Sequence, residues 1–436
     1  MQSSRRNYLA LAPIGIFLAL YLGLGILLEY VLAVPMGFYR IPVVVAFLVA
    51  IGAACLQNRA RTFEDKLQTM ASGMGHPTII TMILIFLLAG VFVGTVGRSS
   101  AESVAYFMLS FIPAQYAVAV LFAVACFVSL AMGTSCGTIA LIAPIAVAVS
   151  GASGFDMALC LASVMAGAMF GDNLSFISDT TIAACTTQKC GMRDKFRTNF
   201  KIALPAAAAS VALYLFATAG QEVAGGIDKP YSFIELIPYI LVLTGGLAGI
   251  NVFIVLVIGI VSGAFITLAS SGTAPLELMA AMGSGAAGSF ETSMVALLVA
   301  AMCALIRENG GFDALLAIVY SSFKGKTGGK FGMGLLVGAM DVATANNTVA
   351  IVMAGPIASE MRERYGISAK KAASILDTWS CIFQGVIPYG AQMLYTVGAA
   401  ATLGFTVSAF DVIAYLYYPV CLLVSSAASF LLSRAD

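Results

Sequence analysis

The stretch GDNLSFISDTT, residues 171–181, interrupts an apolar segment that extends from residue 157 to residue 188. A segment of this length can cross a bilayer, which takes about 20 apolar residues. Two carboxylates and a run of Gly, Asn and Ser in its middle do not suit a continuous helix in lipid. Polar backbone at membrane depth persists only where it is buried in protein or lines a cavity. The stretch therefore predicts a broken membrane helix whose break faces a functional path.

The composition is that of a membrane protein. Of 436 residues, 60% are hydrophobic and 10% are charged, whereas soluble domains carry about 25% charged residues. The nine cysteines lack metal-ligand spacing and the chain has one histidine, so neither a zinc site nor a disulfide framework is expected. The sequence contains no phosphate-binding loop, and nothing in it suggests a nucleic-acid partner. We expect no enzyme and no cofactor, with an ion gradient as the energy source.

Eight segments are candidate spans, and the first is too long for an ordinary signal peptide. They are 8–32, 41–56, 79–97, 198–218, 232–247, 250–271, 291–307 and 409–433. The apolar stretches 114–150, 157–188 and 331–400 are interrupted by polar clusters. We interpret 114–150 and 331–357 as re-entrant hairpins, and 157–188 and 372–400 as crossings with a central break.

This topology separates the basic residues by side. Nineteen Lys and Arg fall on one side, against three, Arg40, Arg98 and Lys229, on the other. Because basic residues favour cytoplasmic loops, both termini are predicted to be cytoplasmic. The fold class is an all-α polytopic protein of the inner membrane of a prokaryote, with about ten crossing helices and two hairpins.

The two halves match in layout. The cluster GTSCGT (133–138) precedes Pro144, and TANNT (344–348) precedes Pro356. A second polar cluster begins 27 residues after Pro144, at Gly171, and 28 residues after Pro356, at Gln384. With opposite orientations, the halves predict an inverted repeat with interrupted helices, which is typical of secondary transporters. The expected divisions are 1–78 for N-terminal helices, 79–218 for the first repeat, 219–290 for a linker with helices, and 291–433 for the second repeat.

The clusters supply the candidate site. Carboxylates can bind Na⁺ or carry a proton, so Na⁺ is expected at Asp172 and Asp179; the alternative is that one of the two caps a half-helix. The candidate ion-binding residues are Asp172, Asn173, Ser175, Ser178, Asp179 and Thr180. The candidate substrate-binding residues are Thr134, Ser135, Thr138, Thr344, Asn346, Asn347, Thr348, Asp377, Gln384, Pro388 and Tyr389.

Four further residues lie outside these two sets of candidates. Asp341 precedes the second hairpin tip and can act in the site or beside it. Glu291 and Trp379 are interpreted as interfacial anchors, and His76 as an ordinary loop residue. The basic segment KCGMRDKFRTNFK (189–201) is interpreted as a topology-fixing cytoplasmic loop with anionic lipid as a secondary partner.

At GTSCGT and GDNLSFISDTT the sequence resembles the NhaC family of sodium/proton antiporters, with Phe176 where that family has Pro. The resemblance covers residues 79 to 400, and the hairpin clusters are also similar to the wider ion-transporter superfamily with its divalent-anion/sodium symporters. It implies a scaffold domain, a mobile transport domain that holds both hairpins, a homodimer and elevator-type motion.

Two functions follow from these features. The first is Na⁺/H⁺ antiport at Asp172 and Asp179. The second is Na⁺- or H⁺-coupled transport of an amino acid or small carboxylate, with Asn346 and Asn347 holding the solute. A channel is disfavoured because hairpins that open to one face each suit alternating access.

Overall fold

The computed structural model describes residues 7–28, 32, 41–175, 178–219, 231–270, 272–288 and 290–432. Within these residues the chain is helical and contains no strand. The elements of the first half are η1 (Tyr8–Leu11), α1 (Ala12–Leu18), η2 (Ala19–Gly23), α2 (Leu24–Ile26), α3 (Val43–Leu56), α4 (Phe63–Met74), α5 (Pro77–Phe111), η5 (Ala114–Tyr116), α6 (Ala117–Met132), α7 (Ser135–Ser153), α8 (Met157–Leu174), α9 (Asp179–Gln188) and α10 (Met192–Thr218). Those of the second half are α11 (Phe233–Leu247), α12 (Val252–Ser270), α13 (Pro275–Gly288), α14 (Phe290–Glu308), α15 (Gly311–Ser322), α16 (Gly325–Thr344), α17 (Asn347–Tyr365), α18 (Ala369–Val386), α19 (Ala391–Thr402), α20 (Ala409–Ala414) and α21 (Tyr417–Leu432).

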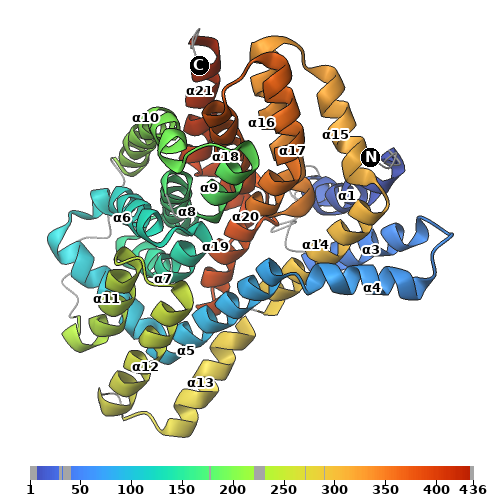
Figure 1. Cartoon of the computed structure of the whole chain (residues 1–436). Coiled ribbons are helices and arrows are strands. Elements are labelled where there is room, and N and C mark those ends of the chain that lie inside the picture. Colours follow the sequence, from blue (N-terminus) through green and yellow to red (C-terminus); the bar gives the residue numbers. More distant parts are fainter. Residues whose placement is uncertain are drawn as a thin grey trace.

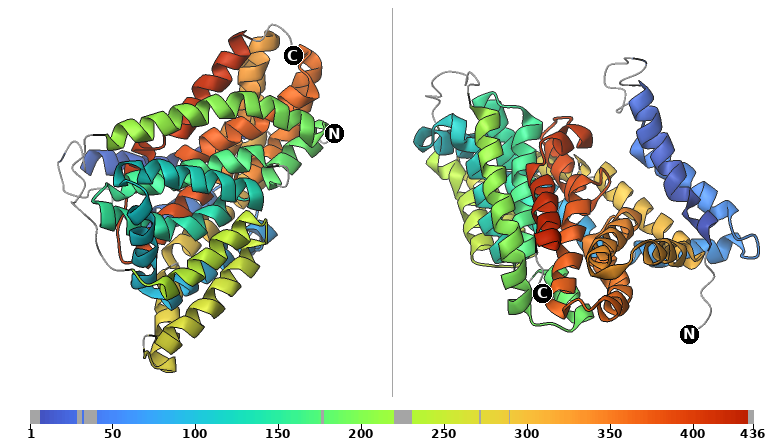
Figure 2. Two further views of the ribbon diagram at one scale, coloured as in Figure 1. Left: turned by 90° about the vertical axis from the view of Figure 1, so that its left-hand side faces the viewer. Right: turned by 90° about the horizontal axis from the view of Figure 1, so that it is seen from above.

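The helices have the length and apolarity of a polytopic membrane protein. Among the described residues, seven helical segments are long and apolar enough to cross a bilayer, and four shorter apolar helices accompany them. The predicted all-α polytopic fold class is confirmed. Figure 1 shows α16 and α17 side by side, and Figure 2 shows the long helix α10, in green, lying along the bundle.

The hairpins and breaks of the two halves share one register. Gly133 and Ala345 both have the left-handed backbone conformation, with φ of 69° and 52°, and they lie 212 residues apart (345 minus 133). The same separation relates the proline inside each following helix, Pro144 and Pro356. It also relates the starts of α8 and α18, at 157 and 369, and of α9 and α19, at 179 and 391.

The register corrects one detail of the sequence comparison. A separation of 212 aligns Asp172, rather than Gly171, with Gln384, because the spacing from each proline is 28 residues in both halves. It also aligns the starts of α4 and α13, at 63 and 275. Helix α13 packs along α5, and α4 packs along α14. Element order and packing thus extend the correspondence back to residue 63, ahead of residue 79.

Two helix boundaries differ from the prediction. The expected span 409–433 is divided into α20 and α21, because Pro419 has no amide to donate to the carbonyl of Tyr415. That carbonyl instead accepts a hydrogen bond from the Tyr214 hydroxyl, at 3.1 Å. Helix α10 begins at Met192, earlier than residue 198. The segment 192–197 is part of the helix, but its charged residues excluded it from a span chosen by apolarity.

The interpretation of Trp379 as an interfacial anchor was wrong. Trp379 is 4% exposed, and its indole donates a hydrogen bond to Ser426 Oγ at 3.0 Å. The ring stacks on Phe430 at 6.0 Å between centroids and lies against Gly334 on α16. Trp379 therefore joins α18 to α16 and α21 in the interior.

Candidate functional site

A buried carboxylate lies where the first hairpin tip meets the first helix break. Asp172, in the last turn of α8, is 6% exposed. Ser135, the first residue of α7, donates its hydroxyl to Asp172 Oδ2 at 2.8 Å. Ser178, at the start of α9, donates to Asp172 Oδ1. Thr180 Oγ1 lies 2.8 Å from Ser178 Oγ and extends this chain of hydroxyls.

The local sequence explains why these side chains converge. Gly133 ends α6 in the left-handed conformation, and Thr134 then caps α7 by accepting a hydrogen bond from the Gly137 amide at 3.3 Å. This sharp turn places Ser135 at a helix N-terminus. Helix α8 ends with the Ser175 amide bonded to the Gly171 carbonyl at 2.8 Å. Phe176, the departure from the family motif, lies outside the described residues.

The second half completes this arrangement. Gln392, in the first turn of α19, donates its side-chain amide to Ser135 Oγ at 2.9 Å. Gln392 corresponds to Thr180 in the 212-residue register. The carboxylate of the first half is thus held by a hydroxyl that the second half orients.

A second buried network lies beside the first. Lys195 on α10 and Asp377 on α18 form an ion pair in which each side chain is 1% exposed. Lys195 also donates to the Asn173 carbonyl and to Thr181 Oγ1, both at 2.7 Å. Asn199, one turn further along α10, donates to Asp377 Oδ2 at 2.9 Å. Asp377 therefore balances the charge of Lys195. The groups that hydrogen-bond to the Asp172 carboxylate are hydroxyls rather than this lysine.

The structure separates the two aspartates of the motif. Asp179 is exposed in the first turn of α9, where a carboxylate interacts favourably with the helix dipole. The N-cap residue of α9 is Ser178 rather than Asp179, and an ion-binding role for Asp179 stays a prediction. The Ser175 hydroxyl donates to the Leu130 carbonyl at 3.0 Å.

The predicted substrate residues of the first tip are placed at α7. Thr134 caps the helix, and Thr138 donates back to the Thr134 carbonyl at 2.9 Å. Only Ser135 among them contacts Asp172.

The predicted residues of the second half lie around the second tip. Asn346 caps α17 by accepting from the Val349 amide at 3.0 Å, as Thr134 does for α7. Thr344 donates to backbone carbonyls, and Asn347 accepts from the Thr348 amide. Gln384 donates to the Ala345 carbonyl at 3.2 Å, and Tyr389 donates to the Val342 carbonyl at 2.8 Å.

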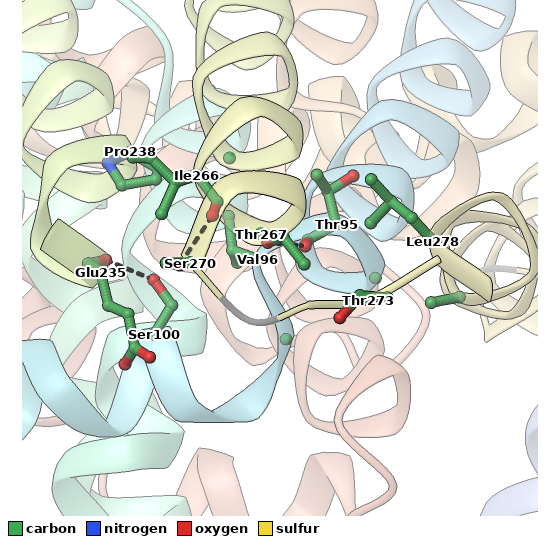
Figure 3. A pocket seen from close by; sticks show the side chains of 14 residues that line it. Thr95, Val96, Ser100, Glu235, Pro238, Ile266, Thr267, Ser270, Thr273 and Leu278 are labelled. Carbon is green, nitrogen blue, oxygen red and sulfur yellow. Dashed lines mark hydrogen bonds between the residues drawn. The ribbon is translucent and has the colours of Figure 1, made fainter. Parts of the chain in front are cut away.

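Pro388 lies in the lining of a cavity of about 590 Å³, together with Glu291 and Tyr21. Figure 3 shows a different pocket, of about 290 Å³, between α5, α11, α12 and α13. There Ser100 donates to the Glu235 carbonyl at 2.5 Å, and Thr267 donates to the Thr95 carbonyl at 3.1 Å. That pocket contains no predicted site residue.

Sequence reasoning missed Lys195, Asn199 and Gln392. Lys195 and Asn199 stood in a segment interpreted as a cytoplasmic loop, yet their spacing of four residues places both on one helix face. Gln392 belonged to the second polar cluster. The 212-residue register would have identified it as the residue that corresponds to Thr180.

The described residues contain no group of three or more His, Cys, Asp and Glu side chains that could hold a metal ion. The oxygen atoms at this site are those of the Asp172 carboxylate and of the hydroxyls that donate to it. Hard cations accept both kinds of oxygen as ligands.

Comparison with known proteins agrees with this architecture. Residues 41–218 and 230–434 match the model of the Na⁺/H⁺ antiporter family. The Na⁺/H⁺ antiporter NhaC of Bacillus subtilis (strain 168) is 22% identical over 351 residues, which cover 73% of this chain and 77% of the relative. A malate-2H⁺/Na⁺-lactate antiporter of the same organism is 26% identical over 197 residues, covering 44% of this chain and 39% of the relative.

Two further similarities are more limited. An uncharacterized protein of Haemophilus influenzae is 37% identical over 105 residues, covering 24% of this chain and 20% of the relative. The matched region therefore spans well under half the length of this relative and of the malate/lactate antiporter. Among solved structures, the YdaH transporter of Alcanivorax borkumensis is 15% identical, with a TM-score of 0.38, covering 81% of this chain and 87% of that one.

The repeated hairpins and helix breaks, with a buried carboxylate between them, are the architecture of a polytopic membrane transporter. The chain belongs to the Na⁺/H⁺ antiporter family.

Proposed function

We propose that this protein exchanges Na⁺ for H⁺ and binds Na⁺ at Asp172. The observation that carries the proposal is the setting of the Asp172 carboxylate, which is buried and hydrogen-bonded to two hydroxyls. A buried charge is costly unless it is paired. Each hydroxyl that donates to the carboxylate keeps a lone pair that can face a cation.

The position of the site at two interrupted elements supports alternating access. Residues on a hairpin tip and a helix break can change their exposure when the elements that carry them move as a unit. We propose an elevator-type motion of α6–α9 and α16–α19 against the other helices, in a homodimer with both termini cytoplasmic. Na⁺ and H⁺ are the coupling ions, and the lipid bilayer is the surrounding partner.

The second candidate is coupled transport of a small carboxylate or amino acid. The malate-2H⁺/Na⁺-lactate antiporter among the relatives favours it. In that case Asp172 binds the coupling ion, and the tip around Asn346 and Asn347 contacts the solute.

Proteoliposomes that contain a pH-sensitive dye test the first proposal. With the native protein, an inward Na⁺ gradient should drive proton movement without any organic solute, and Asp172→Asn should reduce the rate at least tenfold. Glu363→Gln is the matched control, because the Glu363 side chain is 71% exposed. Proton movement that appears only after addition of malate, lactate or an amino acid would favour the second candidate.

A further inference from the structure

A second buried carboxylate lies at the other hairpin, near the backbone of Gln384 on α18, and no described side chain is hydrogen-bonded to its oxygen atoms. Asp341, in the last turn of α16, is fully buried. Neither Oδ1 nor Oδ2 has a hydrogen-bond partner among the described residues. An ionised carboxylate buried in this way is very costly, so the arrangement implies a ligand that neutralises Asp341 and comes from outside the chain.

The repeat register shows that this carboxylate is specific to the second half. Asp341 corresponds to Ser129, whose hydroxyl is satisfied by donating to the Ala168 carbonyl at 2.6 Å. Conversely, Asp172 corresponds to Gln384, whose Oε1 is buried without a partner. Asp172 and Asp341 therefore lie on opposite elements of the repeat: Asp172 is in the last turn of the broken helix α8, and Asp341 is in the last turn of the hairpin helix α16.

The surroundings of Asp341 differ from those of Asp172. The titratable side chains that face this part of α16 are Cys303 on α14, Cys381 on α18 and Tyr389 before α19. The Tyr389 hydroxyl donates to the Val342 carbonyl, and the Cys303 thiol donates to the Ala343 carbonyl. None of the three is basic, and two of them offer sulfur rather than oxygen.

Unlike Asp172, Asp341 has no hydrogen bond from a described hydroxyl, and this difference favours one of the possible ligands. A hard metal cation gathers several oxygen ligands, and the hydroxyls around Asp172 can supply them. A proton needs a single carboxylate oxygen. We propose that Asp341 carries the proton that the protein exchanges for Na⁺, so that the two ions occupy separate carboxylates in the two halves of the repeat.

The route that we infer for the proton starts at the cavity lined by Pro388, although Asp341 itself does not line that cavity. Pro388 borders the 590 Å³ cavity, and the adjacent Tyr389 reaches Val342, the residue next to Asp341. In each cycle, the Asp341 carboxylate takes up one proton from one side of the membrane. The carboxyl group releases that proton to the other side after the conformational change, so no bond other than O–H is made or broken.

The inference rests on the proposed antiport, and two assays in the same proteoliposomes separate them. The first is exchange of ²²Na⁺ for unlabelled Na⁺, which needs no proton. The second is Na⁺-driven proton movement. Asp341→Asn is expected to keep ²²Na⁺ exchange within about twofold of the native rate and to lose at least tenfold in proton movement. Asp172→Asn is expected to lose both activities.

Each contrary result has a separate meaning. Proton movement by Asp341→Asn at the native rate would overturn the assignment of the proton and leave the antiport intact. Loss of ²²Na⁺ exchange in a folded Asp341→Asn protein would also overturn it, and would indicate a second Na⁺ site. A native protein that exchanges ²²Na⁺ without moving protons would overturn both the antiport and the inference. If Asp341→Asn does not fold, Asp341→Glu must shift the pH dependence of proton movement, and an unchanged pH profile would contradict the proposal.

Discussion

Gln392 and Ser135 are 257 residues apart in the chain, and their side chains are joined by a hydrogen bond of 2.9 Å. Gln392 lies in the first turn of the helix that follows the second break, and Ser135 begins the helix that follows the first hairpin tip. Because Ser135 in turn donates to Asp172, a change in the position of α19 is transmitted to the carboxylate of the other half. This contact ties the two repeats together at the proposed Na⁺ site.

Replacing Gln392 by Leu should therefore weaken Na⁺ binding without abolishing it. Loss of one hydrogen bond costs about 0.5–1.5 kcal/mol, which corresponds to a two- to tenfold higher half-saturating Na⁺ concentration. The measurement is the Na⁺ dependence of proton movement. Thr396→Val is the control, because the Thr396 hydroxyl donates to a carbonyl of its own helix, that of Gln392, and makes no other hydrogen bond among the described residues. An unchanged Na⁺ dependence in Gln392→Leu would mean that Ser135 is positioned without it.

Removing one charge of the Lys195–Asp377 ion pair should destabilise the protein more than removing both charges. Lys195→Met leaves a buried carboxylate without its cation, which costs about 3–5 kcal/mol. The double variant Lys195→Met with Asp377→Leu should recover much of this loss, because no unpaired charge remains. Thermal unfolding in detergent measures both effects. Equal destabilisation of the single and double variants would show that the pair acts through other contacts, such as that of Lys195 with the Asn173 carbonyl.

The packing of α16 on α18 should depend on the absence of a side chain at residue 334. A Cβ at Gly334 would lie 2.2 Å from Trp379 Cδ2, so Gly334→Ala forces the ring or the helix to move. Overpacking of this kind costs about 1–3 kcal/mol and should lower the unfolding temperature. Gly283→Ala on α13 is the matched control, since a Cβ there meets nothing within 4 Å. If both variants unfold at the same temperature, the close contact with Trp379 is not a constraint.

The left-handed backbone at the two hairpin tips predicts that Ala345→Gly and Gly133→Ala have opposite effects on stability. Ala345 has the left-handed conformation that Gly133 has in the first half. This conformation costs a non-glycine residue about 1–2 kcal/mol. Ala345→Gly should therefore be neutral to stabilising, with part of the gain offset by the greater freedom of glycine in the unfolded chain. Gly133→Ala should be destabilising, and thermal unfolding of the two variants compares them directly. A Gly133→Ala protein as stable as the native one would contradict the shared tip geometry.

The sequence was most informative where its polar clusters interrupt apolar segments. Unpaired backbone is so costly in lipid that the runs at 133–138, 171–181 and 384–392 had to be tips or breaks, and the structure places them there. The short helix α13 was missed because its 14 residues are too few to cross a bilayer, and a search for spans passes over them.

The parts that the sequence could not supply depend on contacts between distant segments. Lys195 and Asp377 are both charged and were interpreted separately, and only the packing of α10 on α18 shows that they neutralise each other. Trp379 was assigned to the interface by residue type alone, whereas Gly334 leaves the space that buries it. Asp172 and Asp179 share a motif, but the helix that begins at Asp179 turns this residue outward.

Direct binding of ²²Na⁺ to the purified protein in detergent tests the central claim, that Asp172 holds the transported Na⁺. A scintillation proximity assay should show saturable binding to the native protein. The account predicts no saturable binding to Asp172→Asn, and binding with native affinity to Asp341→Asn and Glu363→Gln. Saturable binding of native affinity to a folded Asp172→Asn protein would contradict it.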